Sequence, residues 1–228
     1  MQIPANKLAE LITAKTPERR ERIVRQVRHG STDHPNFYQC FHKPAREFLI
    51  GGARDATHIL TTIDKLKARR KTKWFATDSQ ITTEALRSLV KLAPTLHKVS
   101  GSFVRPGSRN AVLHLEHGDI SVPPNLLIHG ERNGRPLIGA LRFYLAKESS
   151  YQIGVRGAEL VAVMEYLWLQ QIATGERVPD TDLSLVVECM QGRITRAPAD
   201  PTAHITVLQH GCREFARLWH LLDDKEAA

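Results

Sequence analysis

The sequence predicts a protein of the α/β class in the α+β arrangement, with an N-terminal helical region over residues 1–80 and an α/β domain over residues 81–228. Two observations predict this organisation. Helical periodicity dominates the chain up to about residue 98, and strand-like alternation follows it. In addition, Asn133-Gly134 lies between two apolar runs, which indicates a β-hairpin because both residues tolerate the positive φ of a type I′ turn.

The N-terminal region contains two long helical patterns. The segment TPERRERIVRQVRHG carries its own end signals: Thr16 can cap the first turn, Pro17 fits the first helical position, and Gly30 can end the helix. A second pattern runs from Ala45 to about Arg70. Gly51-Gly52 is the point at which we expect this second helix to bend or split.

The later elements alternate between strands and helices. A third helix, ITTEALRSLVKLAP, is predicted to end before Pro94. Strands are expected in AVLHLEHGDISV, with a turn at Gly118. GAELVAVMEYLWLQQIATG is apolar nearly all round, so we expect a helix near 157–173 that packs on a sheet. A second hairpin should turn near Gln191-Gly192, and a final amphipathic helix should begin at Asp200-Pro201.

The charge of the chain suggests a polyanionic partner. The formal net charge is +8, which suits nucleic acid or, alternatively, a protein with solvated basic faces. The densest basic run supplies the candidate nucleic-acid-binding residues, which are Lys65, Lys67, Arg69, Arg70, Lys71, Lys73 and Trp74. Lysine and arginine neutralise phosphates, and an aromatic ring can stack on a base. A cation-rich helix end also suits the helix dipole, so both interpretations stay open.

Other signals restrict the class of protein. No apolar run reaches the roughly 18 residues of a membrane span, and the N-terminus lacks the apolar core of a secretory signal. Cys40, Cys189 and Cys212 are odd in number and lack metal-ligand spacing. We therefore expect a cytoplasmic protein with no membrane partner. Histidine spacing predicts no zinc site, and neither a phosphate-binding glycine loop nor a serine-nucleophile turn is present.

The turn at Asn133-Gly134 sets the register of the central hairpin. Counting back from it, Leu127 faces Ala140 and Asn125 faces Arg142. Because residues two apart on a strand share a face, these four side chains are expected to form one patch. For Asn125 and Arg142 the simplest alternative is a cross-strand polar pair at a sheet edge.

From Thr82 onward the chain resembles the PD-(D/E)XK, or restriction-endonuclease-like, superfamily, whose core has the order α-β-β-β-α-β. The resemblance implies a mixed sheet flanked by helices. In these nucleases the first hairpin strand carries an aspartate, often after proline, and the second carries an acid-any-lysine triplet. Pro124-Asn125 and Ala140-Leu141-Arg142 stand at the matching positions. The segment also looks similar to uncharacterised bacterial proteins of this general type, through Ser121-Val122, Gly139, Arg142 and Lys147.

The resemblance implies a specific chemistry that this chain has altered. Two carboxylates would hold Mg²⁺, the metal would activate water for attack on a phosphodiester, and a lysine would assist. Here asparagine and alanine replace the acids, and an arginine, which stays protonated, replaces the lysine. The metal site is therefore expected to be degenerate. Carboxylates that could compensate are Glu84, Asp119 and Glu159.

Three functional hypotheses follow. The first is a nucleic-acid-binding protein of nuclease-like fold with an inactive metal site, binding DNA in preference to RNA. The second is an active, divergent, Mg²⁺-dependent nuclease with relocated carboxylates. The third is a protein-interaction module, in which Phe37, Tyr38 and Phe41 form either a docking surface or packed core. The candidate catalytic residues are Asp119, Asn125, Arg142 and Glu159.

Overall fold

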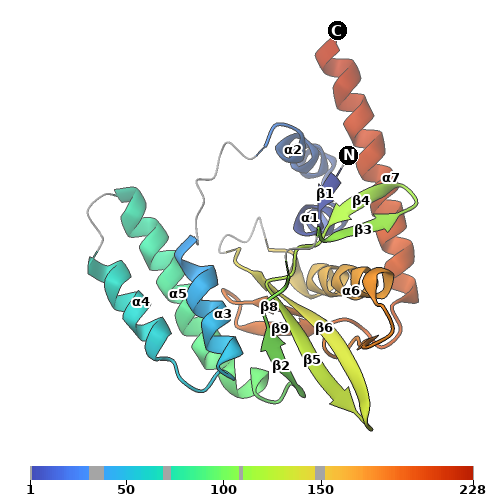
Figure 1. Ribbon diagram of the computed structural model, residues 1–228. Coiled ribbons are helices and arrows are strands. Elements are labelled where there is room, and N and C mark those ends of the chain that lie inside the picture. Colours follow the sequence, from blue (N-terminus) through green and yellow to red (C-terminus); the bar gives the residue numbers. More distant parts are fainter. Residues whose placement is uncertain (1, 31–38, 69–72, 108–109, 147–151, 228) are drawn as a thin grey trace.

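The computed structural model describes residues 2–30, 39–68, 73–107, 110–146 and 152–227 (Figure 1). The elements are β1 (Gln2–Pro4), α1 (Ala5–Thr13), α2 (Pro17–Arg28), α3 (Gln39–Ile50), α4 (Thr57–Ala68), α5 (Lys73–Leu96), β2 (Gly101–Val104), β3 (Val112–Leu115), β4 (Gly118–Ser121), β5 (Leu126–Arg132), β6 (Arg135–Tyr144), α6 (Gly154–Ile172), β7 (Val178–Pro179), β8 (Leu185–Glu188), β9 (Arg193–Arg196) and α7 (Thr202–Ala227). Within these residues, no helix has the length and apolarity needed to cross a membrane.

The main sheet has the strand order β2-β5-β6-β8-β9, with β7 paired to β6. Strand β6 runs parallel to β8, and the pairs β2–β5, β5–β6 and β8–β9 are antiparallel. Helices α3, α4 and α5 gather on one side of this sheet, while α6, α1, α2 and α7 lie on the other (Figure 1). The predicted mixed sheet flanked by helices is confirmed.

The central hairpin has the predicted register. Arg132 pairs with Arg135, and Leu127 pairs with Ala140. The turn residues Asn133 and Gly134 have φ values of 54° and 75°, as a type I′ turn requires. The pairing continues without interruption through Gly139 opposite Ile128, so neither strand carries the bulge that would have shifted the patch.

Alternate residues of β6 face different cores. Ala140 and Tyr144 belong to the core shared with α6, α1 and α7, whereas Leu141 and Phe143 belong to the core shared with α3, α4 and α5. The helix predicted near 157–173 is α6, and buried residues such as Leu160 pack it on the sheet. The second hairpin is also confirmed, since β8 and β9 are antiparallel and turn through residues 189–192.

The predicted N-terminal helices form, and the second helical pattern splits at the expected position. The side chain of Thr16 caps α2 by accepting a hydrogen bond from the Arg19 amide at 3.3 Å, as expected. The long pattern from 45 to 70 is two helices, α3 and α4, which separate at Gly51-Gly52, where Gly52 has a φ of 77°. Glycine adopts this backbone conformation with little strain, so the chain can turn there.

Helix α5 does not stop before Pro94, and the predicted end was wrong. The helix continues to Leu96, which is fully buried in the core next to the sheet. Pro94 removes one backbone donor, but the following turn still closes because the His97 amide donates to the Ala93 carbonyl at 2.8 Å. Burial of Leu96 offsets the lost hydrogen bond.

The N-terminal segment joins the second half of the chain rather than standing apart from it. Strand β1 pairs in parallel with β4 in a separate three-stranded sheet, β1-β4-β3. Leu8 and Leu11 of α1 lie in the same core as Phe215 of α7. The predicted boundary at residue 80 falls inside α5. The β3–β4 hairpin, which turns at residues 116–117 just before Gly118, is thus an insertion into the order of the main sheet.

Candidate functional site

Asn125 lies immediately before β5 and extends the hydrogen bonding of the hairpin at its open end. Its amide donates to the Leu141 carbonyl at 2.9 Å, and its Oδ1 accepts from the Phe143 amide at 2.7 Å. Its Nδ2 lies 3.4 Å from Nδ1 of His42 on α3. Burial, together with nearby Arg46, lowers the pKa of His42, which favours a neutral ring able to accept from Asn125. The carboxamide therefore links β6 to the α3 layer.

Arg142 points to the opposite layer. Its Nε donates to Oε1 of Glu165 on α6 at 2.6 Å. The Glu165 side chain is fully buried, and only 12% of the Arg142 side chain is exposed. Leu127 and Ala140 do pack on this face, as the predicted patch requires, but the hydrogen bonds of Asn125 and Arg142 lead to different helices. The hairpin thus carries two separate polar links instead of one polar site.

The Arg142–Glu165 pair is an incompletely satisfied buried ion pair. Burial raises the pKa of Glu165, and the adjacent guanidinium opposes that rise. The other carboxylate oxygen of Glu165 and Nη2 of Arg142 are both buried without a hydrogen-bond partner. A buried carboxylate with a single guanidinium contact depends strongly on that contact.

The hairpin positions leave no anionic oxygen for a metal. Asn125 offers a neutral oxygen that already accepts a hydrogen bond, and Ala140 is fully buried. Glu165 is the acid that contacts this face of the hairpin, and the Arg142 guanidinium neutralises its charge. Across the described ranges, no group of three or more His, Cys, Asp or Glu side chains is arranged to hold a metal ion.

A second polar cluster lies two residues further along β6. Tyr144 is opposite Glu188 of β8, which in turn pairs with Arg193 of β9. Arg193 donates twice to the fully buried Glu188 carboxylate, at 2.5 and 2.6 Å. Burial raises the pKa of Tyr144, and the carboxylates of Glu10 and Glu188 add to the shift. Tyr144 therefore stays protonated and serves as a hydrogen-bond donor.

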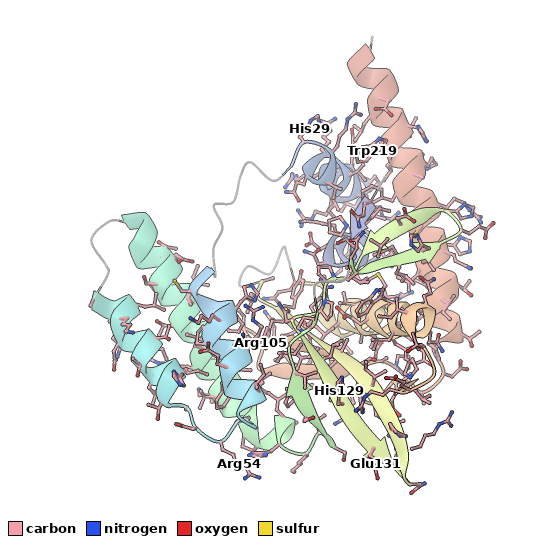
Figure 2. All side chains as sticks on the ribbon, in the orientation of Figure 1. His29, Arg54, Arg105, His129, Glu131 and Trp219 are labelled. Carbon is pink, nitrogen blue, oxygen red and sulfur yellow. The ribbon has the colours of Figure 1, made fainter. Side chains whose placement is uncertain are left out.

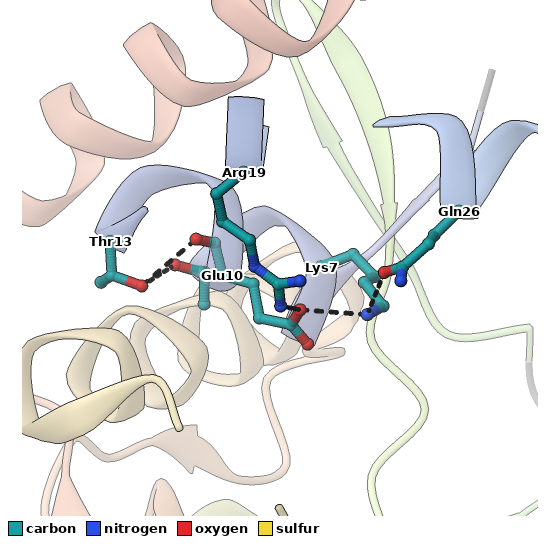
Figure 3. A network of polar contacts seen from close by, with 6 residues as sticks. Lys7, Glu10, Thr13, Arg19 and Gln26 are labelled. Atoms are coloured by element: carbon teal, nitrogen blue, oxygen red, sulfur yellow. Dashed lines mark hydrogen bonds and ion pairs between the residues drawn. The ribbon is translucent and has the colours of Figure 1, made fainter. Parts of the chain in front are cut away.

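Glu10 links helices α1 and α2 (Figure 3), and its carboxylate also lies close enough to Tyr144 to raise the pKa of that phenol. Its carboxylate accepts from Lys7 Nζ at 3.0 Å and from Arg19 Nη2 at 3.3 Å, and Lys7 also donates to Gln26 at 3.2 Å. Glu10 is 7% exposed. Each of the three buried glutamates on this side of the sheet is bound by a cation, so all three act as structural links between elements.

The carboxylates proposed as relocated metal ligands are engaged elsewhere. Asp119 on β4 accepts a hydrogen bond from His114 Nδ1 at 2.8 Å, in a pocket of about 550 Å³. Glu159 lies 3.4 Å from Nε2 of His204. Glu84 accepts from Gln80 at 3.0 Å. None of these three hydrogen bonds involves Asn125 or Arg142.

The basic run is only partly described. Lys65 and Lys67 are exposed on α4, and Lys67 pairs with Asp64 at 2.9 Å. Arg69, Arg70 and Lys71 lie outside the described residues. Lys73 and Trp74 begin α5, but their side chains are outside the described part.

The aromatic segment is packed where the structure describes it. Phe41 is fully buried and meets the Phe143 ring edge-on, with a centroid separation of 5.1 Å. This supports the packed-core alternative for Phe41. Phe37 and Tyr38 lie outside the described residues.

Sequence reasoning missed Glu165, Glu188, Glu10 and His42. A signal for Glu165 was present, because it is the lone charged residue in the apolar run LVAVMEYLWL. A charge at a position predicted to be buried requires a partner. The partner could not be named from sequence, since it depends on which strand the helix crosses.

Comparison with known proteins adds no assignment: no family model matches the chain, and no curated protein matches its sequence.

Proposed function

We propose that the protein is a cytoplasmic nucleic-acid-binding protein, preferring DNA to RNA, on a degenerate PD-(D/E)XK-like fold whose metal site has been replaced by an ion pair. The observation that carries this proposal is the 2.6 Å contact between Arg142 and Glu165. In the proposed ancestral arrangement this face of the hairpin would hold a metal between acids. Here the Arg142 guanidinium binds the one buried acid that reaches it, through a single hydrogen bond.

The order of elements supports the fold part of the proposal. Helix α5 is followed by β2, β5 and β6, then by α6 and β8, which is the order α-β-β-β-α-β once the β3–β4 hairpin and the two-residue strand β7 are set aside. Helices α5 and α6 contribute to the cores on opposite faces of the sheet. Other α+β folds share this order, so the order supports the proposal without deciding it.

The chemistry of the hairpin supports loss of catalysis. Phosphodiester hydrolysis of this type needs a metal held by anionic oxygen, and positions 125 and 140 provide none. Arg142 adds a positive charge that would repel Mg²⁺. The net charge of +8 supports retained attraction to a polyanion.

The proposal is tested by measuring binding and cleavage side by side. The purified chain should bind a fluorescent duplex of about 20 base pairs at about 50 mM salt, with affinity falling steeply as salt rises. The same samples with Mg²⁺ or Mn²⁺ should show little or no cleavage. Metal-dependent cleavage that disappears in Asp119→Ala or Glu159→Ala would replace the proposal with an active nuclease, whereas absence of binding at this salt would favour a protein-interaction role.

A further inference from the structure

The net positive charge is confined to one part of the chain. Residues 39–105, which contain α3, α4, α5 and β2, hold thirteen of the 32 lysines and arginines but only five of the 24 aspartates and glutamates. This segment, called here the basic lobe, therefore has a formal charge of +8. The rest of the chain holds nineteen of each kind and is neutral. The whole excess charge of the protein belongs to the basic lobe.

The cations of the basic lobe lie at the surface. Nine of them have described side chains, and all but Arg46 are exposed. The exposed set is Lys43, Arg54, Lys65, Lys67, Arg87, Lys91, Lys98 and Arg105. Figure 2 shows Arg54 at the turn between α3 and α4, and Arg105 beyond the end of β2. The charge is thus spread over several elements and is not limited to the run from Lys65 to Lys73.

Most of these cations have no carboxylate partner within the described residues. Lys67 pairs with Asp64, and Arg105 lies 4.0 Å from Glu47. The other six exposed cations take part in no ion pair with a described carboxylate. Among the five acids of the lobe, Asp78 is buried, and Asp55 accepts from the backbone of Thr57.

Cations outside the basic lobe are used differently. Many hold elements together through carboxylates, as in the pairs Arg19–Glu10, Arg28–Asp223, Arg132–Asp180, Arg142–Glu165 and Arg193–Glu188. Internal pairing neutralises charge that would otherwise attract an external anion. The unpaired cations of the basic lobe remain available to bind phosphates. Each phosphate that they neutralise would release condensed counterions, which favours binding.

We infer that the basic lobe is a platform for the phosphate backbone of double-stranded nucleic acid, bound without sequence preference. This inference rests on the proposed function and specifies its surface and ligand. The phenylalanines of the lobe with described side chains, Phe41, Phe48 and Phe103, are buried, so they offer no ring to an unpaired base. Among the described side chains of the lobe, the exposed lysines and arginines can contact the phosphate backbone, and a duplex presents the denser array of phosphates.

The platform lies on the opposite side of the sheet from the ion pair. Leu86 and Leu89 of α5 pack in the core that contains Leu141 and Phe143, whereas Arg142 faces α6. Nucleic acid on the basic lobe would therefore lie away from the Arg142–Glu165 pair. Binding would not require the hairpin end at all, which explains how it can persist after the metal site is lost.

The test compares charge reversal on the two parts of the molecule. One variant carries Arg87→Glu and Lys91→Glu, one helical turn apart on α5. Its matched control carries Arg135→Glu and Arg196→Glu, which are exposed on β6 and β9 and change the net charge equally. Binding of a duplex of about 20 base pairs is measured by fluorescence anisotropy over a series of salt concentrations. The α5 variant should bind about tenfold more weakly and with a salt slope lower by about two, while the control should change by less than about twofold.

The outcomes distinguish failure of this inference from failure of the proposed function. If the wild type does not bind at about 50 mM salt, the proposed function fails and this inference fails with it. If the wild type binds but the control loses as much affinity as the α5 variant, the inference fails and the proposed function stands. Tighter binding of the single strand than of the duplex would overturn the ligand assignment. Circular dichroism checks that both variants fold, and Arg87→Gln with Lys91→Gln repeats the comparison with a smaller charge change.

Discussion

Arg142 and Glu165 have the environment that departs furthest from that of an ordinary surface ion pair. The glutamate is fully buried, one of its oxygens has no partner, and the arginine is nearly enclosed. Such a pair contributes little net stability compared with apolar residues of the same volume, because both charges lose their hydration. Removal of one partner is far more costly, since the other charge stays buried.

Arg142→Met should therefore destabilise the protein by about 3 kcal/mol, measured by urea unfolding. The double variant Arg142→Met with Glu165→Leu should recover most of that loss. Arg196→Met, at an exposed position of β9, serves as the control and should change stability by less than about 0.5 kcal/mol. A single variant as stable as the wild type would show that the contact does not hold Glu165 in place.

The loss in Arg142→Met should also depend on pH. Burial raises the pKa of Glu165 above its ordinary range, and removal of Arg142 takes away the charge that opposes the rise. The folded state then holds a proton that the unfolded state has released, so stability falls as pH rises through this interval. Unfolding at pH 5 and pH 8 should show the smaller loss at pH 5. An equal loss at both values would mean that Glu165 does not titrate differently in the folded state.

Asn125 permits a second test at the scale of single residues. Its Oδ1 accepts from the Phe143 amide at 2.7 Å, and an aspartate could accept the same bond. Asn125→Leu should cost about 1 to 3 kcal/mol, because it leaves that amide unsatisfied. Asn125→Asp should cost clearly less in the same thermal or urea measurement. If both variants lose the same stability, the role of Asn125 lies in its contact with His42 instead.

At the scale of elements, the hairpins were predicted well because their information is local. A type I′ turn needs two positive φ values, and Asn133-Gly134 supplies them, so the register of seven residue pairs follows from one dipeptide. The end of α5 was predicted poorly because the cost of Pro94 is local while its compensation is not. Leu96 holds the last turn through tertiary burial, which no window of sequence contains. Strand β1 is only three residues long and was invisible for the same reason.

The candidate site shows the same division between local and tertiary information. The positions of Asn125 and Arg142 along the hairpin followed from the turn, but their partners His42 and Glu165 lie 83 and 23 residues away in sequence. Pairing across such separations depends on how helices cross the sheet. Polarity at a buried position could be predicted, and the identity of its partner could not.

Gly139 tests the packing of β6 against Leu183, in the turn that precedes β8. A Cβ at this position would collide with the carbonyl oxygen and side chain of Leu183, and the backbone there cannot move aside easily. Gly139→Ala should therefore destabilise the protein by about 3 kcal/mol. The control is Gly134→Ala, where the added Cβ meets open space. There only the positive φ disfavours alanine, so the loss of stability should be about 1 kcal/mol. Equal losses in thermal unfolding would show that the strand can shift away from Leu183.

At the scale of the whole molecule, the order of the chain does not match the division of its cores. The core on the α6 side takes residues from both ends of the chain, since α1 and α7 both contribute to it. The core on the other side takes α3, α4 and α5 together with the sheet. Charge follows the second division, because the basic lobe corresponds to the helices of one core. The predicted boundary at residue 80 divides both cores, because each core contains residues from before and after it.

The whole-molecule prediction is that residues 81–228 do not fold alone. This fragment lacks Leu8 and Leu11, which are buried beside Phe215, and it lacks α3 and α4, which cover the opposite face of the sheet. It also begins inside α5, so the helix that covers Leu141 and Phe143 loses its first turns. Apolar surface would be exposed to water on both sides of the sheet. This exposure costs roughly 25 cal/mol of stability for each Å² of apolar surface. Urea unfolding followed by circular dichroism should show no cooperative transition in the fragment, in contrast to the full chain.

A longer fragment, 39–228, restores one core only and should unfold at lower urea than the full chain. A sharp transition in fragment 81–228 near the midpoint of the full chain would show that the sheet and its later helices form an independent domain.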